Sequence, residues 1–100
     1  MRTFIISSSS SICKAIGDRC KLIRLAKNLT QQQLADMVGA SLSSMRRFES
    51  QGQGSLEMFV KITQALQVVQ QLEPLLNQQE ISIAELEKQQ MTQPRKRARP

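Results

Sequence analysis

The chain lacks most of the side chains on which enzyme active sites depend. Its 100 residues include no His, no Trp and no Tyr, and its eight acidic residues stand singly along the sequence. Without an imidazole there is no general base of the usual kind, no Cys–His pair and no His-containing zinc site. We therefore expect a protein that is not an enzyme and that needs neither a metal nor another cofactor.

Long apolar runs and paired cysteines are also missing. No apolar segment approaches the ~20 residues of a membrane span, and the apolar stretch at residues 4–6 is too short for a signal peptide. Cys13 and Cys20 lie in one predicted helix, where their spacing puts the Cα atoms ~10 Å apart, beyond the ~7 Å reach of a disulfide. These features favour a cytoplasmic protein with no membrane partner, in which Cys20 is a small core residue.

The net charge of +6 is unevenly distributed. Residues 1–50 carry eight Lys or Arg and three acids, residues 51–94 carry two Lys and five Glu, and four cationic residues follow in the last six positions. Such an excess is compatible with an ordinary solvated surface and also with a polyanionic partner for the first half of the chain. Only motifs can decide between these two interpretations.

Apolar residues recur at helical spacing through most of the sequence, so we predict an all-α fold. The first helix is expected over residues 12–27, the fourth over residues 56–66 behind Ser55, and a fifth over residues 68–76, interrupted at Pro74. Ser82 can begin a further short helix. The predicted organisation is an N-terminal arm (residues 1–11), a helical domain (12–78), a helical extension (79–91) and a disordered basic tail (92–100).

The strongest local pattern is a helix-turn-helix over about residues 30–50. Thr30 and Gln33 form a capping box for a second helix, whose inner face is predicted to contain Leu34, Ala35, Met37 and Val38. Gly39 supplies a left-handed residue at its end, and Ser41 caps a third helix over residues 42–50.

The predicted third helix has two distinct faces. Met45, Phe48 and Glu49 fall on the inner side, and the opposite side carries Ser43, Arg46, Arg47 and Ser50. Arginines among small hydroxyl residues suit the DNA major groove, where Arg can contact guanine with two hydrogen bonds. The alternative is a solvated surface with no ligand.

The chain resembles the lambda-repressor-like, Cro/XRE family of helix-turn-helix regulators over about residues 15–72. The resemblance rests on the spacing R-x-x-x-x-L-T-Q-x-x-L-A that begins at Arg24, on the glycine turn, and on the run Arg46-Arg47-Phe48-Glu49. It implies a five-helix bundle that binds DNA as a dimer. It also implies a phosphate contact for Gln31 and contacts to bases or backbone for Leu42, Ser43, Ser44, Arg46 and Arg47. Leu42 departs from the polar residue common at its position and suits a thymine methyl group.

The same resemblance implies an ion pair between Arg24 and Glu49 that joins the first and third helices. Glu49 lies near the inner face and needs a partner there, although a surface glutamate is the alternative. The basic tail, with Arg95, Lys96, Arg97 and Arg99, is predicted to contact DNA phosphates. A merely solubilising terminus is the alternative for the tail.

Residues 56–62 and the Leu-rich segment after them are similar to the antitoxins encoded beside HipA-type kinase toxins. The first hypothesis is therefore a dimeric, sequence-specific repressor that acts as the antitoxin of a Hip-type operon. It implies three partners: double-stranded DNA with an inverted-repeat operator, a second copy of the chain, and a HipA-like kinase. The alternatives are a free-standing phage- or plasmid-type regulator, and a protein-interaction module with secondary DNA contact. The dimer surface is expected to use Leu72, Leu75, Leu76 and Ile81, with residues 4–6 as a second candidate. The protein is expected to be cytoplasmic and associated with a bacterial nucleoid.

Overall fold

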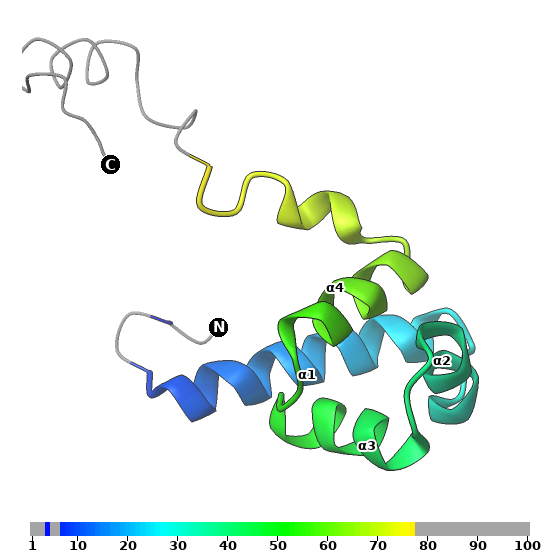
Figure 1. The fold of residues 1–100 in the computed structure, drawn as a ribbon. Helices are drawn as coiled ribbons and strands as arrows, with labels where there is room; N and C mark the ends of the chain where they lie inside the picture. Colours follow the sequence, from blue (N-terminus) through cyan, green and yellow to red (C-terminus); the bar gives the residue numbers. More distant parts are fainter. Residues whose placement is uncertain (1–3, 5–6, 78–100) are drawn as a thin grey trace, which may run out of the picture. The chain divides into compact units, whose positions relative to one another are not determined.

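All regular structure in the described part of the chain is helical. A computed structural model describes Phe4 and residues 7–77 (Figure 1). The elements are α1 (Ser9–Ala26), α2 (Gln31–Val38), α3 (Leu42–Gln51), α4 (Leu56–Ala65) and the short 3₁₀ helix η2 (Val69–Leu72). The chain divides into two compact units, Met1–Gln70 and Gln71–Pro100, and α1 to α4 all belong to the first. The predicted all-α class is confirmed, whereas the described residues contain four α-helices instead of five.

Helix α1 begins earlier than predicted. Ser8 is its N-cap, and the Ser8 hydroxyl accepts a hydrogen bond from the Ser11 amide at 3.2 Å. The serine run therefore provides the cap and first turn of α1, where an arm up to residue 11 was expected. The apolar periodicity starts only at Ile12, so this polar first turn carries no periodic signal. The rest of the predicted arm lies outside the described residues, apart from Phe4 and Ser7.

The caps of the helix-turn-helix match their prediction. The Thr30 hydroxyl accepts from the Gln33 amide at 3.0 Å, and the Gln33 side chain accepts from the Thr30 amide at 2.8 Å. Gly39 ends α2 with a left-handed backbone at φ 72°, and the Ser41 hydroxyl accepts from the Ser44 amide at 3.0 Å. These local bonds set the ends of both helices independently of tertiary packing.

The predicted fifth helix does not form. In place of a helix over residues 68–76 the chain makes the single turn η2 and then non-helical turns. Gln67 has a left-handed backbone at φ 64°, and Pro74 lacks the amide that would continue a helix. Leu75 and Leu76 are exposed. The predicted extension with its Ser82-capped helix, the basic tail, and Ile81 of the predicted dimer surface all lie outside the described residues.

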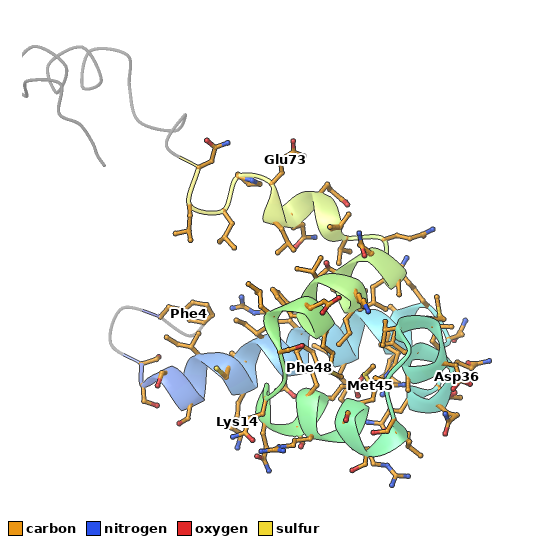
Figure 2. All side chains as sticks on the ribbon, viewed as in Figure 1. Phe4, Lys14, Asp36, Met45, Phe48 and Glu73 are labelled. Carbon is orange, nitrogen blue, oxygen red and sulfur yellow. The ribbon has the colours of Figure 1, made fainter. Side chains whose placement is uncertain are left out.

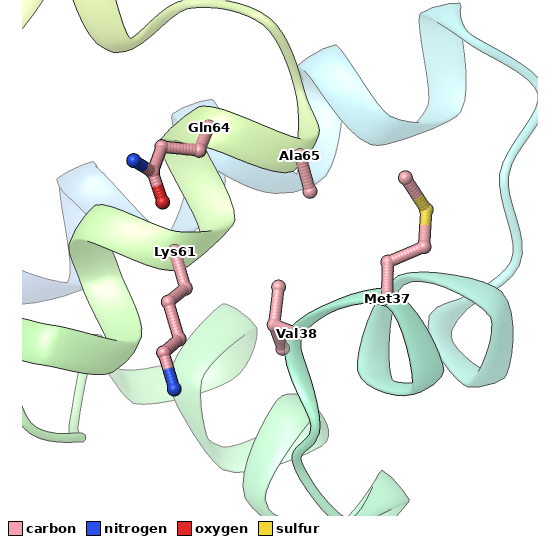
Figure 3. A pocket seen from close by; sticks show the side chains of 5 residues that line it. All are labelled: Met37, Val38, Lys61, Gln64 and Ala65. Atoms are coloured by element: carbon pink, nitrogen blue, oxygen red, sulfur yellow. The ribbon is translucent and has the colours of Figure 1, made fainter.

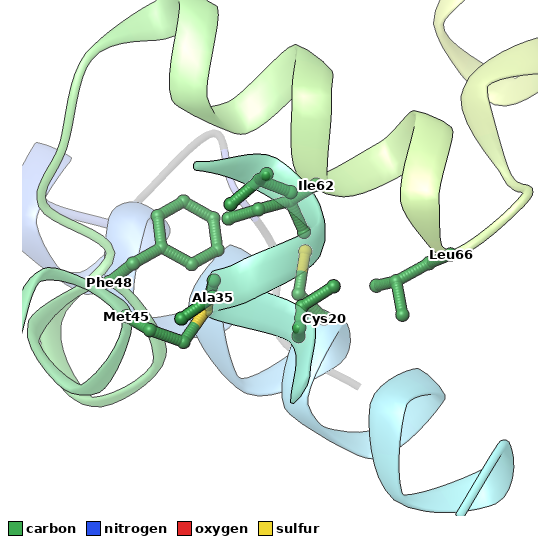
Figure 4. Packing of buried hydrophobic residues seen from close by; sticks show 8 residues of the cluster. Cys20, Ala35, Met45, Phe48, Ile62 and Leu66 are labelled. Carbon is green, nitrogen blue, oxygen red and sulfur yellow. The ribbon is translucent and has the colours of Figure 1, made fainter. Parts of the chain in front are cut away.

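The core of the first unit is formed by residues from all four α-helices (Figure 4). Leu34, Met45, Ile62 and Leu66 are fully buried, and Cys20, Ala35, Val38 and Phe48 complete the cluster. Met37 was predicted to join this cluster but is 56% exposed. At 100° per residue, Met37 lies outside the stripe defined by Leu34 and Val38, so its side chain projects to solvent. No helix in the described residues is long and apolar enough to span a membrane.

Two glycines allow α1 and α3 to cross closely. A Cβ atom at Gly17 would overlap the Phe48 carbonyl oxygen and lie 2.9 Å from that of Glu49. Gly52, just after α3, faces the main chain of Cys13 with no room for a Cβ, and its backbone is left-handed at φ 69°. The crossing therefore depends on the absence of a side chain at both positions.

The two cysteines are both free thiols and should differ strongly in reactivity. Cys13 is exposed and Cys20 is buried. Burial, and secondarily the negative charge of Glu49, raises the pKa of the Cys20 thiol from 9.0 to about 11. Because the thiolate is the reactive form, iodoacetamide at pH 8 should modify one thiol per folded chain and two in denaturant, as counted by mass spectrometry. Rapid modification of both thiols without denaturant would contradict this burial.

Candidate nucleic-acid interface

Helix α3 presents a polar, cationic face because three of its residues anchor the opposite side. Met45, Phe48 and Glu49 are buried, and Met45 and Phe48 point into the core (Figure 2). The other side of α3 is exposed to solvent and carries Ser43, Ser44, Arg46, Arg47 and Ser50. Leu42, the first residue of α3, is half-buried. The structure thus gathers the predicted α3 contact residues on one solvent-facing surface, with Leu42 at its border.

The angle between α2 and α3 is fixed by a tight backbone motif. The Ala40 amide donates to the Ala35 carbonyl at 2.9 Å, and the Gly39 amide donates to the Asp36 carbonyl at 3.3 Å. This pair of bonds is the Schellman arrangement, which satisfies the last carbonyls of a helix. Since Ser41 caps α3 only two residues later, the turn leaves little freedom between the helices. A rigid scaffold of this kind can hold the α3 side chains in register with a groove.

The buried polar group beneath this surface is an ion pair between α1 and α3. Arg24 Nε donates to Glu49 Oε2 at 2.6 Å and Arg24 Nη2 donates to Glu49 Oε1 at 3.0 Å, with both side chains over 90% buried. Arg24 Nη1 also donates to the Leu29 carbonyl at 2.7 Å, in the connection between α1 and α2. The structure therefore brings together the two residues that the family resemblance pairs. The bidentate contact is the stronger geometry for such a pair.

Gln31, the predicted phosphate contact, belongs to the same network. It is the first residue of α2, and its side-chain amide donates to Glu49 Oε1 at 2.9 Å. The remaining amide hydrogen and the carbonyl oxygen of its side chain are not used in this bond. The sequence did not indicate that Glu49 holds Gln31, because the contact joins residues on two different helices.

The two arginines of α3 have different surroundings. Arg47 Nε donates to the side-chain oxygen of Gln53 at 2.8 Å, beside a hollow of about 350 Å³ lined also by Ser44 and Ser55. Arg46 has no hydrogen-bond or ion-pair partner among Phe4 and residues 7–77. No sequence pattern points to Gln53, because its contact with Arg47 depends on how the chain turns at Gly52. The tail residues Arg95, Lys96, Arg97 and Arg99 lie outside the described residues.

A second hollow of about 440 Å³ lies between α2 and α4 (Figure 3). Met37, Val38 and Ala65 give it an apolar side, and Lys61 and Gln64 give it a polar side. Lys61 is within 3.5 Å of Glu57 on the same helix. Glu57 is not among the five residues that line the hollow, and none of those five has a carboxylate, so the lining itself offers no acid–base pair. Within the described residues no group of three His, Cys, Asp or Glu side chains could hold a metal ion.

Comparison with known proteins finds a similarity over about half of the chain. No protein-family profile matches the chain. The chain is 43% identical over 54 residues to a protein of Vibrio cholerae serotype O1 named as the cryptic phage CTXphi transcriptional repressor RstR. The matched stretch covers 53% of this chain and 48% of that protein, so the chain matches about half the length of its relative. This chain is therefore similar, over about half its length, to part of a phage transcriptional repressor.

Proposed function

We propose that the chain is a sequence-specific DNA-binding repressor of the phage type, acting in the bacterial cytoplasm. The observation that carries the proposal is the exposed Arg and Ser face of α3, held at a fixed angle by the turn from α2. An α-helix fits the major groove of B-DNA, and arginine and serine side chains can reach its base edges. The similarity to a phage transcriptional repressor supports the same function.

That similarity favours a free-standing phage-type regulator over the antitoxin of a Hip-type operon. The relative is named as a phage repressor, and neither the similarity nor the described residues point to a kinase partner. Within the proposal, Arg46 and Arg47 contact bases, and Ser43 and Ser44 contact bases or backbone. Leu42 packs on a thymine methyl group, and Gln31 contacts a phosphate. The basic tail adds phosphate contacts that carry no sequence information.

A single α3 helix covers only one half-site, so the proposal includes a homodimer. Two-fold symmetric regulators of the helix-turn-helix class bind half-sites whose centres are about 10 bp, or a multiple of that, apart. Duplexes selected from a random library by the full-length chain should therefore contain an inverted repeat with this spacing. Such a selected duplex is the operator used in the experiments below.

Arg46→Ala should reduce binding to the selected duplex much more than binding to a scrambled duplex. Loss of a bidentate guanine contact should reduce operator affinity by roughly 1–3 kcal/mol. Arg46→Lys is the matched control, because it keeps the charge and loses the planar pair of donors. It should retain affinity for the scrambled duplex and lose affinity for the operator. Fluorescence anisotropy titrations at fixed salt concentration measure both affinities.

Gln31→Ala should weaken both duplexes by similar factors, because a phosphate contact does not distinguish sequences. Equal losses on the two duplexes for Arg46→Ala would show that Arg46 does not read bases. If the unmodified chain bound no duplex tightly even at low salt, the protein-interaction module would become the better hypothesis.

A further inference from the structure

Only one of the two exposed arginines on α3 is held by another side chain. Arg47 Nε donates to the Gln53 side-chain oxygen at 2.8 Å, and Gln53 lies in the connection between α3 and α4. Arg46 is the next residue along the helix and has no such partner among the described residues. The two side chains carry the same charge, and they differ in that only Arg47 is held by a neighbouring side chain.

The backbone that carries Gln53 is itself fixed. Gly52 turns the chain at φ 69°, and its amide donates to the Phe48 carbonyl at 2.7 Å. The Cα of Gly52 is packed so closely on the main chain of Cys13 in α1 that no Cβ fits. Gln53 therefore follows a turn anchored on two helices, from which its side chain reaches back to Arg47.

The bond to Gln53 uses the Nε–H of Arg47, which lies on one side edge of the guanidinium. A guanidinium has five N–H donors in one plane, and the four on Nη1 and Nη2 are not used by this bond. One N–H from each of these two nitrogens points outward, and the two form a parallel pair at the outer edge. A hydrogen bond at Nε fixes the plane of the group and so the direction in which the outer edge points. Two adjacent acceptors match that edge, whether they are guanine O6 and N7 or two phosphate oxygens.

We propose that Gln53, which lies outside α3, is a positioning residue that orients Arg47 toward a pair of acceptor atoms on DNA. The proposal rests on the DNA-binding function argued above. Holding the long Arg47 side chain in one geometry before binding lowers the entropy that binding must remove. Gln53 acts through Arg47 and makes no DNA contact of its own.

A double-mutant cycle tests this role. Gln53→Ala should weaken binding of the selected duplex by about three- to tenfold, the range expected from freeing one long side chain. In an Arg47→Ala background the same substitution should cause no further loss. Gln51→Ala is the matched control, because Gln51 is an exposed glutamine at the end of α3 with no partner in the described residues, and it should leave affinity unchanged. The thermal midpoint should be the same for Gln53→Ala and the unmodified chain.

The comparison of duplexes identifies the acceptor pair. A loss confined to duplexes with guanine at one position of each half-site indicates guanine, and an equal loss on selected and scrambled duplexes indicates phosphate. An equal loss from Gln53→Ala in both backgrounds would overturn the proposal, because Gln53 would then contact DNA itself. A loss from Arg47→Ala with none from Gln53→Ala would overturn the positioning role alone. The proposed function would still stand, since the Arg46→Ala titrations test it separately.

Discussion

Gly52→Ala should remove about half of the folding free energy of the helical domain, whereas Gly39→Ala should remove a smaller part of it. Each glycine comes directly after a helix and has a left-handed backbone, with φ 69° at Gly52 and 72° at Gly39. A Cβ atom in that conformation costs about 1–2 kcal/mol. The surroundings differ, because a Cβ at Gly39 would meet nothing within 4 Å and one at Gly52 would overlap the main chain of Cys13. Gly39→Ala is therefore a matched control for the conformational part of the effect.

The overlap at Gly52 decides how large the effect is. A flexible side chain could move aside, but here the obstacle is the backbone of α1, so the helix itself must shift. Overpacking of this kind adds about 1–3 kcal/mol, which brings the expected loss to about 2–5 kcal/mol. A domain of roughly 60 residues has a total stability of about 3–9 kcal/mol. Urea denaturation monitored by circular dichroism measures the free energy of unfolding of both variants. Equal losses would show that α1 moves aside for the added Cβ atom without a loss of stability.

Gly17→Ala tests the same crossing without a left-handed backbone. Gly17 lies inside α1, where Ala would ordinarily stabilise a helix by about 1 kcal/mol. A Cβ at this position would overlap the Phe48 carbonyl oxygen. We therefore expect a net destabilisation, and a gain in stability would show that α1 and α3 are not as tightly packed as the structure has them.

The close approach of α1 and α3 could not be predicted from the sequence, whereas the helix caps could. Cap residues such as Thr30, Ser41 and Ser55 bind amides only three residues away, so a short sequence pattern is enough to predict them. Their hydrogen bonds form as predicted. Gly17 and Gly52 matter because α1 and α3 approach each other, and no local pattern records that approach. The predicted fifth helix is wrong because the helical spacing of its leucines was given more weight than Pro74. An interruption was expected at Pro74, but the segment forms no α-helix on either side of it.

The candidate site divides in the same way. Helical periodicity alone is enough to place Arg46 and Arg47 on the exposed side of α3 and Glu49 on the buried side. It carries no information about Gln53, which reaches Arg47 after a left-handed turn, or about the hydrogen bond from Gln31 to Glu49. Those two contacts come from tertiary geometry, and they distinguish side chains that the sequence pattern treats as equivalent.

The other large effect is expected at the buried ion pair. Glu49→Ala should destabilise the domain by about 3–5 kcal/mol, because it leaves the Arg24 guanidinium buried without its counter-charge. Both residues are nearly inaccessible, with side-chain exposures of 6% for Arg24 and 2% for Glu49. Solvent therefore screens the pair little, and the small values typical of surface salt bridges do not apply. Glu49→Ala also leaves Gln31 without the acceptor of its amide hydrogen bond.

Glu49→Gln separates the charge from the shape of the side chain. Glutamine keeps one carbonyl acceptor for Arg24 and loses the negative charge, so we expect an intermediate loss of stability. The same substitution should lower the pKa of Cys20, since the charge of Glu49 is the second cause, after burial, of its rise to about 11. The pH dependence of Cys20 alkylation in a Cys13→Ser background measures that shift. An unchanged Cys20 pKa would mean that the negative charge of Glu49 has no electrostatic effect on the thiol.

A double-mutant cycle on Arg24→Ala and Glu49→Ala measures the coupling itself. Each single variant leaves one buried charge without its partner, whereas the double variant leaves none. The two losses of unfolding free energy should therefore not add. We expect a coupling free energy of about 2–3 kcal/mol from urea denaturation, near the upper end for contacting residues. The double variant should still be less stable than the unmodified chain, because the Leu29 carbonyl loses the hydrogen bond from Arg24 Nη1. Additive losses would mean that the two side chains do not interact in solution, and α1 and α3 would then be held together by the apolar core and the glycine crossing alone.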